Sequence, residues 1–168
     1  MAVNAYLIVD GLTGPSTSKT GAIDVLSFSI GASNTSTYGA GASGKEAKAG
    51  RADLSNLTIM KVLDKTSTTL FNHCCSGDIL KKVILLYDKP VGDQQADYYR
   101  VFLADALITS VQQSGSNENP TESVSFAFQA IEIAYKAEKD DGTLDGAIAA
   151  GFDLETLKSN YAAPDPFK

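Results

Sequence analysis

The chain has 168 residues and a mass of 17.7 kDa, which is the size of one ordinary domain and leaves little room for a second. Its hydrophobic fraction of 43% and charged fraction of 20% are those of a globular protein that can build its own core. The formal net charge of -6 argues against a broad phosphate-binding surface, and therefore against nucleic acid as a partner.

The N-terminal segment lacks the features of a secretory signal peptide, because no basic residue precedes its apolar stretch and Asp10 and Gly11 interrupt it. No uncharged apolar run approaches the length of a membrane-spanning helix, so we expect a soluble protein without membrane insertion. Cys74 and Cys75 are adjacent and poorly placed to form a disulfide with each other, which favours a reducing cytosol. Export from the cell would then need a route without a cleaved signal peptide.

The first third of the chain predicts short β-strands. Residues 5–9 are an apolar run that ends in a turn signal. Residues 22–30 alternate with a period of two, apart from one phase slip at Val25-Leu26 that a bulge would absorb. Residues 57–63 alternate again, but Lys61 shares a face with Leu57 and Ile59, so the alternation does not decide which face of the strand points into the core.

The segment from Gly31 to Arg51 separates two of these strands and consists mostly of Gly, Ala, Ser and Thr. A structureless stretch of this length inside a compact domain needs something to lie against, because its backbone hydrogen bonds and its ordering entropy are otherwise uncompensated. The segment is a first indication of assembly.

The middle of the chain predicts the one helix, over about residues 66–76. Asp64 or Ser67 can cap its start, and Gly77 is placed to end it. Residues 80–87 are apolar on both faces, which is typical of a strand covered on one side by a sheet and on the other by that helix.

The second half predicts longer β-structure. Residues 98–103 and 106–111 form two β-rich runs that a bend or a hairpin separates, and residues 123–135 form the longest strand, with a change of phase at Ile131. Residues 136–168 form a charged and glycine-containing C-terminal extension with one further strand. Many short strands with a single helix predict a mainly β protein of one domain over residues 1–168, an antiparallel sandwich or barrel.

The motifs that could carry chemistry are weak. Gly39 to Gly44 match G-x-G-x-x-G, but no strand directly precedes them, and Glu46 stands where a P-loop needs Ser or Thr. His73 lies beside Cys74 and Cys75, but no second group of Cys or His completes a zinc site, and consecutive helix positions do not face each other. We therefore expect no catalytic residue, no cofactor and no metal.

The order of seven sequence blocks resembles the hemolysin-coregulated protein (Hcp) family, the tube protein of bacterial type VI secretion. The blocks span most of the chain between residues 4 and 157, and no single block is diagnostic alone. They are residues 6–11, 23–31, the small-residue loop to Gly44-Lys45, 57–61, 63–67 leading into 70–71, 120–126 and 131–135.

The resemblance implies a small β-barrel of two sheets with one flanking helix, assembling as a homohexameric ring. In the family such rings stack into a hollow tube, which sheath contraction expels behind a spike protein and which carries effector proteins in its lumen. Assembly would take place in the cytoplasm, before secretion outside the cell or into a target cell. The first and last strands are candidates for edges that neighbouring subunits cover.

We predict that an assembly loop at about residues 32–51 contacts a neighbouring subunit. The candidate interface residues are Asn34, Tyr38, Gly39, Gly41, Gly44, Lys45 and Arg51.

Two rival hypotheses remain open. A monomeric β-barrel that binds a small ligand would have a sealed apolar pocket. An enzyme with Cys74 as its nucleophile would lose turnover in Cys74→Ala. The native size of the protein separates these hypotheses from a ring.

Overall fold

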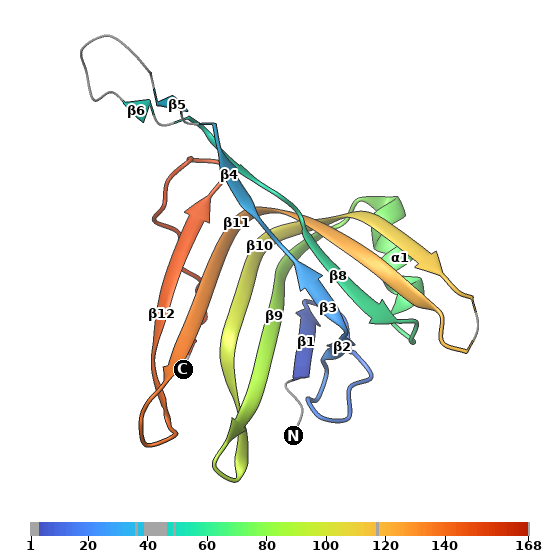
Figure 1. The fold of residues 1–168 in the computed structure, drawn as a ribbon. Coiled ribbons are helices and arrows are strands. Elements are labelled where there is room, and N and C mark those ends of the chain that lie inside the picture. The colour runs from blue at the N-terminus through green and yellow to red at the C-terminus, as the bar shows by residue number, and fades with distance from the viewer. Residues whose placement is uncertain (1–3, 36, 39–46, 49, 117, 168) are drawn as a thin grey trace.

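A computed structural model describes the chain except for residues 1–3, 36, 39–46, 49, 117 and 168 (Figure 1). The described residues contain one α-helix, and their other regular elements are β-strands. The elements are β1 (Asn4–Val9), β2 (Ile23–Val25), β3 (Ser27–Ser29), β4 (Ala32–Asn34), β5 (Thr37–Tyr38), β6 (Ala47–Lys48), β7 (Ala52–Leu54), β8 (Leu57–Val62), α1 (Ser67–Ser76), β9 (Ile79–Val91), β10 (Gln94–Ser114), β11 (Thr121–Glu138) and β12 (Leu144–Asp153).

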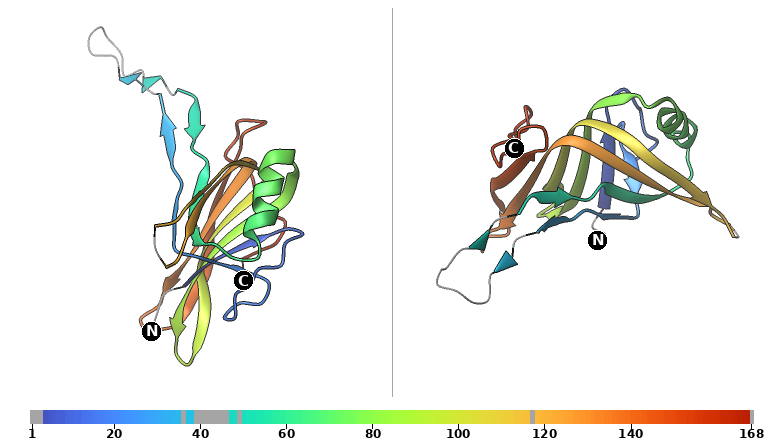
Figure 2. Two further views of the ribbon diagram at one scale, coloured as in Figure 1. Left: turned by 90° about the vertical axis from the view of Figure 1, so that its right-hand side faces the viewer. Right: turned by 90° about the horizontal axis from the view of Figure 1, so that it is seen from above.

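The main sheet is antiparallel and curls into a nearly closed barrel (Figure 2). Its strand order is β2-β1-β9-β10-β11-β8-β3, and β12 adds to the side of β11. Since β2 and β3 are consecutive in the chain, the two ends of this order meet, and the N–H of Leu26 donates to the C=O of Met60 at 2.7 Å. The predicted β-barrel class with one flanking helix is confirmed.

The strand expected over residues 22–30 is two strands. It pairs first with β1 and then, after Leu26, with β8. The phase slip at Val25-Leu26 marks this change of partner, and the Leu26 side chain is exposed there.

The barrel interior is filled by side chains from the inward face of each strand. Val9, Val83, Leu103 and Ile131 are register partners in a row across β1, β9, β10 and β11, and all four are buried in one core cluster. Leu57 and Ile59 of β8 and Phe126 of β11 belong to the same cluster and are completely buried. The inside of the barrel is therefore a packed core.

The helix α1 packs against β10 (Figure 1). Thr66 is its N-cap residue, and Leu70 is the completely buried anchor on its inner side. Gly77 ends the helix in the left-handed conformation, with φ 72°, and donates its N–H to the C=O of His73.

The two β-rich runs of the second half are one continuous strand, β10, so the hairpin alternative between them is wrong. Asp105 has a φ of 45°, yet the register of β10 against β11 is the same on both sides of it, because Ala104 and Ala106 pair with Ala130 and Phe128. The strand therefore continues through Asp105 without reversing, and the register shift of this pair lies further along, between Ile108 and Ser110.

β11 is shared between two partners. Its first part, from Thr121 to Phe126, pairs with β8, and its second part, from Ala130 to Glu138, pairs with β12. Phe128 and Ile131 both belong to the core cluster, so the side-chain phase changes between them as predicted. β8 and β12 consequently diverge from the same strand.

The segment expected to be a structureless loop over about residues 32–51 contains β-structure where it is described. β4 pairs with β7, and β5 pairs with β6, in two small sheets separate from the barrel. The two halves of the segment satisfy each other's backbone hydrogen bonds, which needs no apolar alternation and therefore leaves little signal in the sequence. We call the described residues of 31–55 the ribbon, and it projects well clear of the barrel (Figures 1 and 2).

Among the described helices, none is long and apolar enough to cross a membrane.

Candidate assembly surfaces

The ribbon holds the described candidate interface residues. Asn34 is exposed in β4 and pairs with Ala52 of β7, and Arg51 is exposed just before β7. Tyr38 lies in β5, opposite Ala47. The other candidates, Gly39, Gly41, Gly44 and Lys45, lie outside the described residues, as does the glycine motif that contains them.

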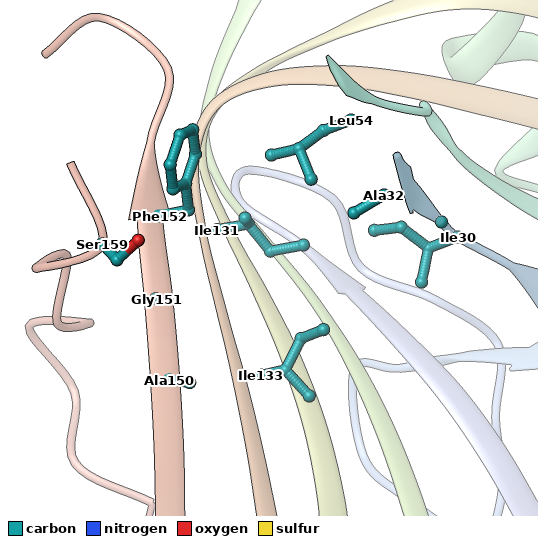
Figure 3. A pocket seen from close by; sticks show the side chains of 10 residues that line it. Ile30, Ala32, Leu54, Ile131, Ile133, Ala150, Gly151, Phe152 and Ser159 are labelled. Atoms are coloured by element: carbon teal, nitrogen blue, oxygen red, sulfur yellow. The ribbon is translucent and has the colours of Figure 1, made fainter. Parts of the chain in front are cut away.

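An apolar groove of about 400 Å³ opens where the ribbon leaves the barrel (Figure 3). Ile30 and Leu54 contribute one wall from the ribbon base, and Ile131, Ile133 and Phe152 contribute the other from β11 and β12. Figure 3 shows these side chains converging on the space where β8 and β12 diverge. Sequence reasoning missed this groove, because its two walls are distant in the chain.

The groove continues into an exposed apolar surface on β11 and β12. Ile133 is 38% exposed, Tyr135 46% and Ile148 75%. Among the described strands, β12 is hydrogen-bonded only to β11, so no strand covers its outer edge, and only its last residue, Asp153, donates its N–H there, to the C=O of Lys158. The last strand is therefore an edge as expected, whereas the first strand is not, because β1 lies between β2 and β9.

A second group of exposed apolar side chains lies on elements at the opposite side of the barrel (Figure 1). Leu26 precedes β3, Val62 ends β8, Phe71 is on α1 and Ile79 begins β9. Their exposed fractions lie between 40% and 65%. The molecule thus presents two different apolar surfaces, one on each side.

The C-terminal segment, residues 159–167, folds back over the outer face of β9, β10 and β11, and we call it the tail. Tyr161, Ala163 and Phe167 pack on Ile84, Leu86 and Phe102, which form a small cluster separate from the barrel core.

Charged groups from the strands reach the tail. Arg100 donates from Nη1 to the C=O of Asp165 and from Nη2 to Glu132 Oε1, both at 2.7 Å. The second carboxylate oxygen of Glu132 accepts the N–H of Ala163 at 2.7 Å. Arg100 and Lys136 lie 5.1 and 4.1 Å from the ring centroid of Phe167. These groups hold the tail by its main chain and by one aromatic ring.

Burial also changes the ionisation of groups at this contact. Burial, and then the charge of Glu132, raises the pKa of Tyr161. Burial and the nearby charge of Arg100 lower the pKa of Lys136, against an opposing effect of Asp97. The tail therefore excludes water from part of the sheet face.

A buried ion pair ties the barrel to α1. The Nζ of Lys61 donates to Glu122 Oε1 at 2.5 Å and to Ser67 Oγ at 3.2 Å, and both charged side chains are completely buried. Ser67 at the start of α1 donates to the same carboxylate oxygen at 2.7 Å, and Gln113 donates to the other at 3.1 Å. The sequence did not decide which face of β8 points into the barrel. The structure shows that the face with Lys61 points inward.

The cysteines and the histidine lie together on the second half of α1. Cys74 packs against the barrel core from α1, Cys75 is exposed, and both are free. His73 Nδ1 lies 2.8 Å from Asp78 Oδ2 at the end of the helix, and hydrogen bonds from Ser76 and then His73 lower the pKa of Asp78. In the part of the chain that the structure describes, no cluster of His, Cys, Asp and Glu could hold a metal ion.

Comparison with known proteins gives a consistent result. Residues 6–135 match a family described as "Type VI secretion system effector, Hcp". The chain is 32% identical over 150 residues to Protein hcp1 of Pseudomonas aeruginosa, which covers 87% of this chain and 91% of that protein.

Solved structures agree. One described as a type six secretion system protein superposes with a TM-score of 0.85 at 26% identity, covering 95% of this chain and 100% of the other. The crystal structure of Hcp1 from Salmonella typhimurium superposes with a TM-score of 0.75 at 28% identity, with the same coverage.

Proposed function

Because the chain belongs to the Hcp family of the type VI secretion system, we propose that it is a structural subunit of the inner tube of that system, built as a homohexameric ring. The rings stack into a hollow tube, which is expelled by contraction of a sheath behind a spike and carries effector proteins. The subunit assembles in the cytoplasm and leaves the cell with the tube. It acts through its contacts with other proteins and not by catalysis.

The observation that carries the proposal is the pair of different apolar surfaces on opposite sides of the barrel. A closed ring is built from heterologous contacts, in which one surface of each subunit meets a different surface of the next. The β12 side, with Ile133, Tyr135 and Ile148, supports one half of such a contact. The helix side, with Leu26, Val62, Phe71 and Ile79, supports the other half.

The ribbon and the groove support the same proposal. A two-stranded ribbon is marginally stable in water without further packing, so a ribbon that projects from its barrel is well suited to lie against a neighbouring subunit. We assign Asn34, Tyr38 and Arg51 to that contact, together with the candidates that lie outside the described residues. The groove at the ribbon base is apolar, as the desolvated centre of an interface is.

Under the rival hypothesis of a ligand-binding monomer, the ligand would bind in the groove, since the barrel interior is filled. A monomer that binds an apolar compound there would favour it. We prefer the ring, because the groove runs directly into the exposed surface of β11 and β12 and is not sealed.

A complementation experiment tests the ring. Ile148→Asp places a charge on the apolar surface of the β12 side, and Phe71→Asp places one on that of the helix side. Each variant alone should therefore be monomeric. An equimolar mixture keeps one intact pair of surfaces and should give heterodimers that grow no further. Sedimentation velocity and native mass spectrometry measure the species, and electron microscopy of the unsubstituted protein should show sixfold rings.

The matched control is Gln95→Asp, at an exposed position near the turn between β9 and β10, which should form rings like the unsubstituted chain. A chain that stays monomeric at every concentration would overturn the proposal. So would single variants that still form complete rings.

A further inference from the structure

The tail and the face beneath it behave as a peptide and its binding site. Along residues 161–167 the chain has no regular secondary structure and adds no strand to the sheet. It is held by apolar side chains and by four kinds of polar contact: Arg100 with the C=O of Asp165, Glu132 with the N–H of Ala163, Lys82 with the carboxylate of Asp165, and the cations around Phe167. None of these contacts depends on the covalent link between tail and barrel.

The charged pair of the face includes no group of the tail. Arg100 and Glu132 lie on neighbouring strands, pair with each other at 2.7 Å and are only 5% and 9% exposed at their side chains. On the same side of the sheet, Phe102 stands in register between Ile84 and Glu132, and Arg100 is the register partner of Leu86. A rigid sheet with oriented charged groups is preorganised for an extended peptide.

The link between β12 and the tail favours exchange. Residues 154–160 form turns on the surface, and Leu157 is held there with a φ of 57°, a left-handed conformation that is strained for a leucine. A strained hinge next to a docked terminal segment is the arrangement that leads to swapping between identical chains. Release of the tail relieves the strain, and the tail of another copy can then fill the face.

We propose that the outer face of β9, β10 and β11 is a peptide-binding site that accepts the C-terminal segment of a second copy of this chain, so that subunits exchange tails. The site recognises a main-chain N–H and C=O at the spacing of Ala163 and Asp165, followed by an aromatic ring at Phe167. Exchange needs only two copies and does not depend on the proposed tube.

Crosslinking of full-length chains tests the exchange. Lys82 lies beside the docked tail, with its Nζ 3.3 Å from Asp165 Oδ2, and both side chains are partly exposed. One population carries Lys82→Cys and the other carries Asp165→Cys, both in a Cys74→Ala, Cys75→Ala background. After mixing, a short bis-maleimide reagent should give covalent heterodimers.

Two controls accompany the mixture. A single chain with both Lys82→Cys and Asp165→Cys should crosslink within itself, which checks that the tail docks. Lys81→Cys replaces Lys82→Cys in the matched control, because Lys81 is highly exposed and pairs with Asp105 and not with the tail. Dimer yield no higher than in this control would overturn the proposal, as would a double variant that fails to crosslink internally.

Substitution of Gly151 provides a second test, in which the yield of crosslinked dimer is compared between variants. A Cβ at Gly151 would lie 2.0 Å from the C=O oxygen of Tyr161, so Gly151→Ala pushes the chain's own tail away. In the chain with Asp165→Cys, whose tail must leave its own face and dock on the unsubstituted face of the other chain, it should raise the dimer yield about fivefold, which corresponds to about 1 kcal/mol. Gly146→Ala on the same strand meets open space and should leave the yield unchanged. An unchanged yield in Gly151→Ala would count against exchange, whatever the size of the assembled particle.

Discussion

The barrel wall and the ribbon are both made of antiparallel pairs, yet they differ in what their side chains contact. In the wall, rows such as Val9, Val83, Leu103 and Ile131 bury one face completely or nearly so. In the ribbon, Ala32 to Asn34 are all exposed, and only its base reaches the barrel, at the groove. The wall buries its side chains within one chain, whereas the ribbon pairs its backbone and leaves the side chains of β4 exposed.

The tail lies between these two cases. It is outside the barrel, like the ribbon, but it covers buried charges, like the wall. The comparison therefore predicts that substitutions in the wall act on folding, those under the tail act partly on folding, and those in the ribbon act on assembly.

The largest effect is expected inside the wall. Glu122→Ala leaves Lys61 buried in the barrel without its carboxylate, and it removes an acceptor from Ser67. The free energy of unfolding should fall by about 3–5 kcal/mol, measured by urea denaturation. The pair Lys61→Met with Glu122→Leu should recover most of that loss, because apolar side chains of similar volume often replace a buried ion pair without cost. A loss below about 1 kcal/mol in Glu122→Ala would show that the wall tolerates an unpaired charge.

A smaller effect is expected under the tail. Glu132→Ala removes the partner of Arg100 and the acceptor for the N–H of Ala163, so unfolding free energy should fall by about 2 kcal/mol and the Ala163 amide should exchange faster with deuterium. Glu138→Ala, on the same strand, breaks only a partly exposed pair with Lys89 and should cost less than about 1 kcal/mol. Equal losses of unfolding free energy in the two variants would show that the contacts under the tail stabilise the fold no more than a surface ion pair does.

A substitution in the ribbon should reduce assembly and hardly change the stability of the fold. A Cβ at Gly50 would lie 2.6 Å from the backbone carbon of Thr35, so Gly50→Ala forces the two sides of the ribbon apart. Unfolding free energy should change by less than about 0.5 kcal/mol, while the ring fraction in sedimentation should drop. Gly31→Ala, whose Cβ would meet only the Ser55 hydroxyl at 3.5 Å, is the control and should preserve both. Intact rings in Gly50→Ala would show that ring assembly does not depend on the ribbon.

The smallest effect is a loss of barrel stability at alkaline pH. Phe28, Tyr87 and Tyr99 form an aromatic cluster, and burial raises the pKa of both tyrosines above the ordinary 10.0. Since the neutral phenols are favoured in the folded state, their contribution is complete below pH 10 and is lost as the pH rises through the raised pKa values. Urea denaturation at a series of pH values should show this decline.

Tyr87→Phe should flatten the decline, and Tyr135→Phe, at an exposed position, should leave it unchanged. A decline of the same steepness in Tyr87→Phe would place its origin outside the cluster.

The sequence predicted the parts of the fold that depend on alternation. The β-barrel class follows from the short alternating runs, and the change of phase at Ile131 marks where β11 leaves β8 for β12. The alternation of residues 57–63 could not assign Lys61, because its burial depends on Glu122, which is 61 residues away in the chain. Partners so distant are visible only once the strands are paired.

Features that depend on pairing without an apolar pattern were predicted poorly. The ribbon is made of small and polar residues, so its composition suggested a loop, and only the register of β4 with β7 reveals the strands. The groove combines Ile30 and Leu54 with Phe152, and the tail site combines Arg100 and Glu132 with Ala163. The isolated Arg100 in an otherwise apolar run was the one available signal for the tail site.

The division of β11 between two partners also has a mechanical consequence. A pull on β12 passes to β11 across their hydrogen bonds, and from there along one uninterrupted backbone into the centre of the barrel. Because the strands are antiparallel and long, tension along them shears many hydrogen bonds at once instead of peeling them one by one. A pull along β12 would therefore be carried by its hydrogen bonds to β11 together, and not by the turn that connects the two strands.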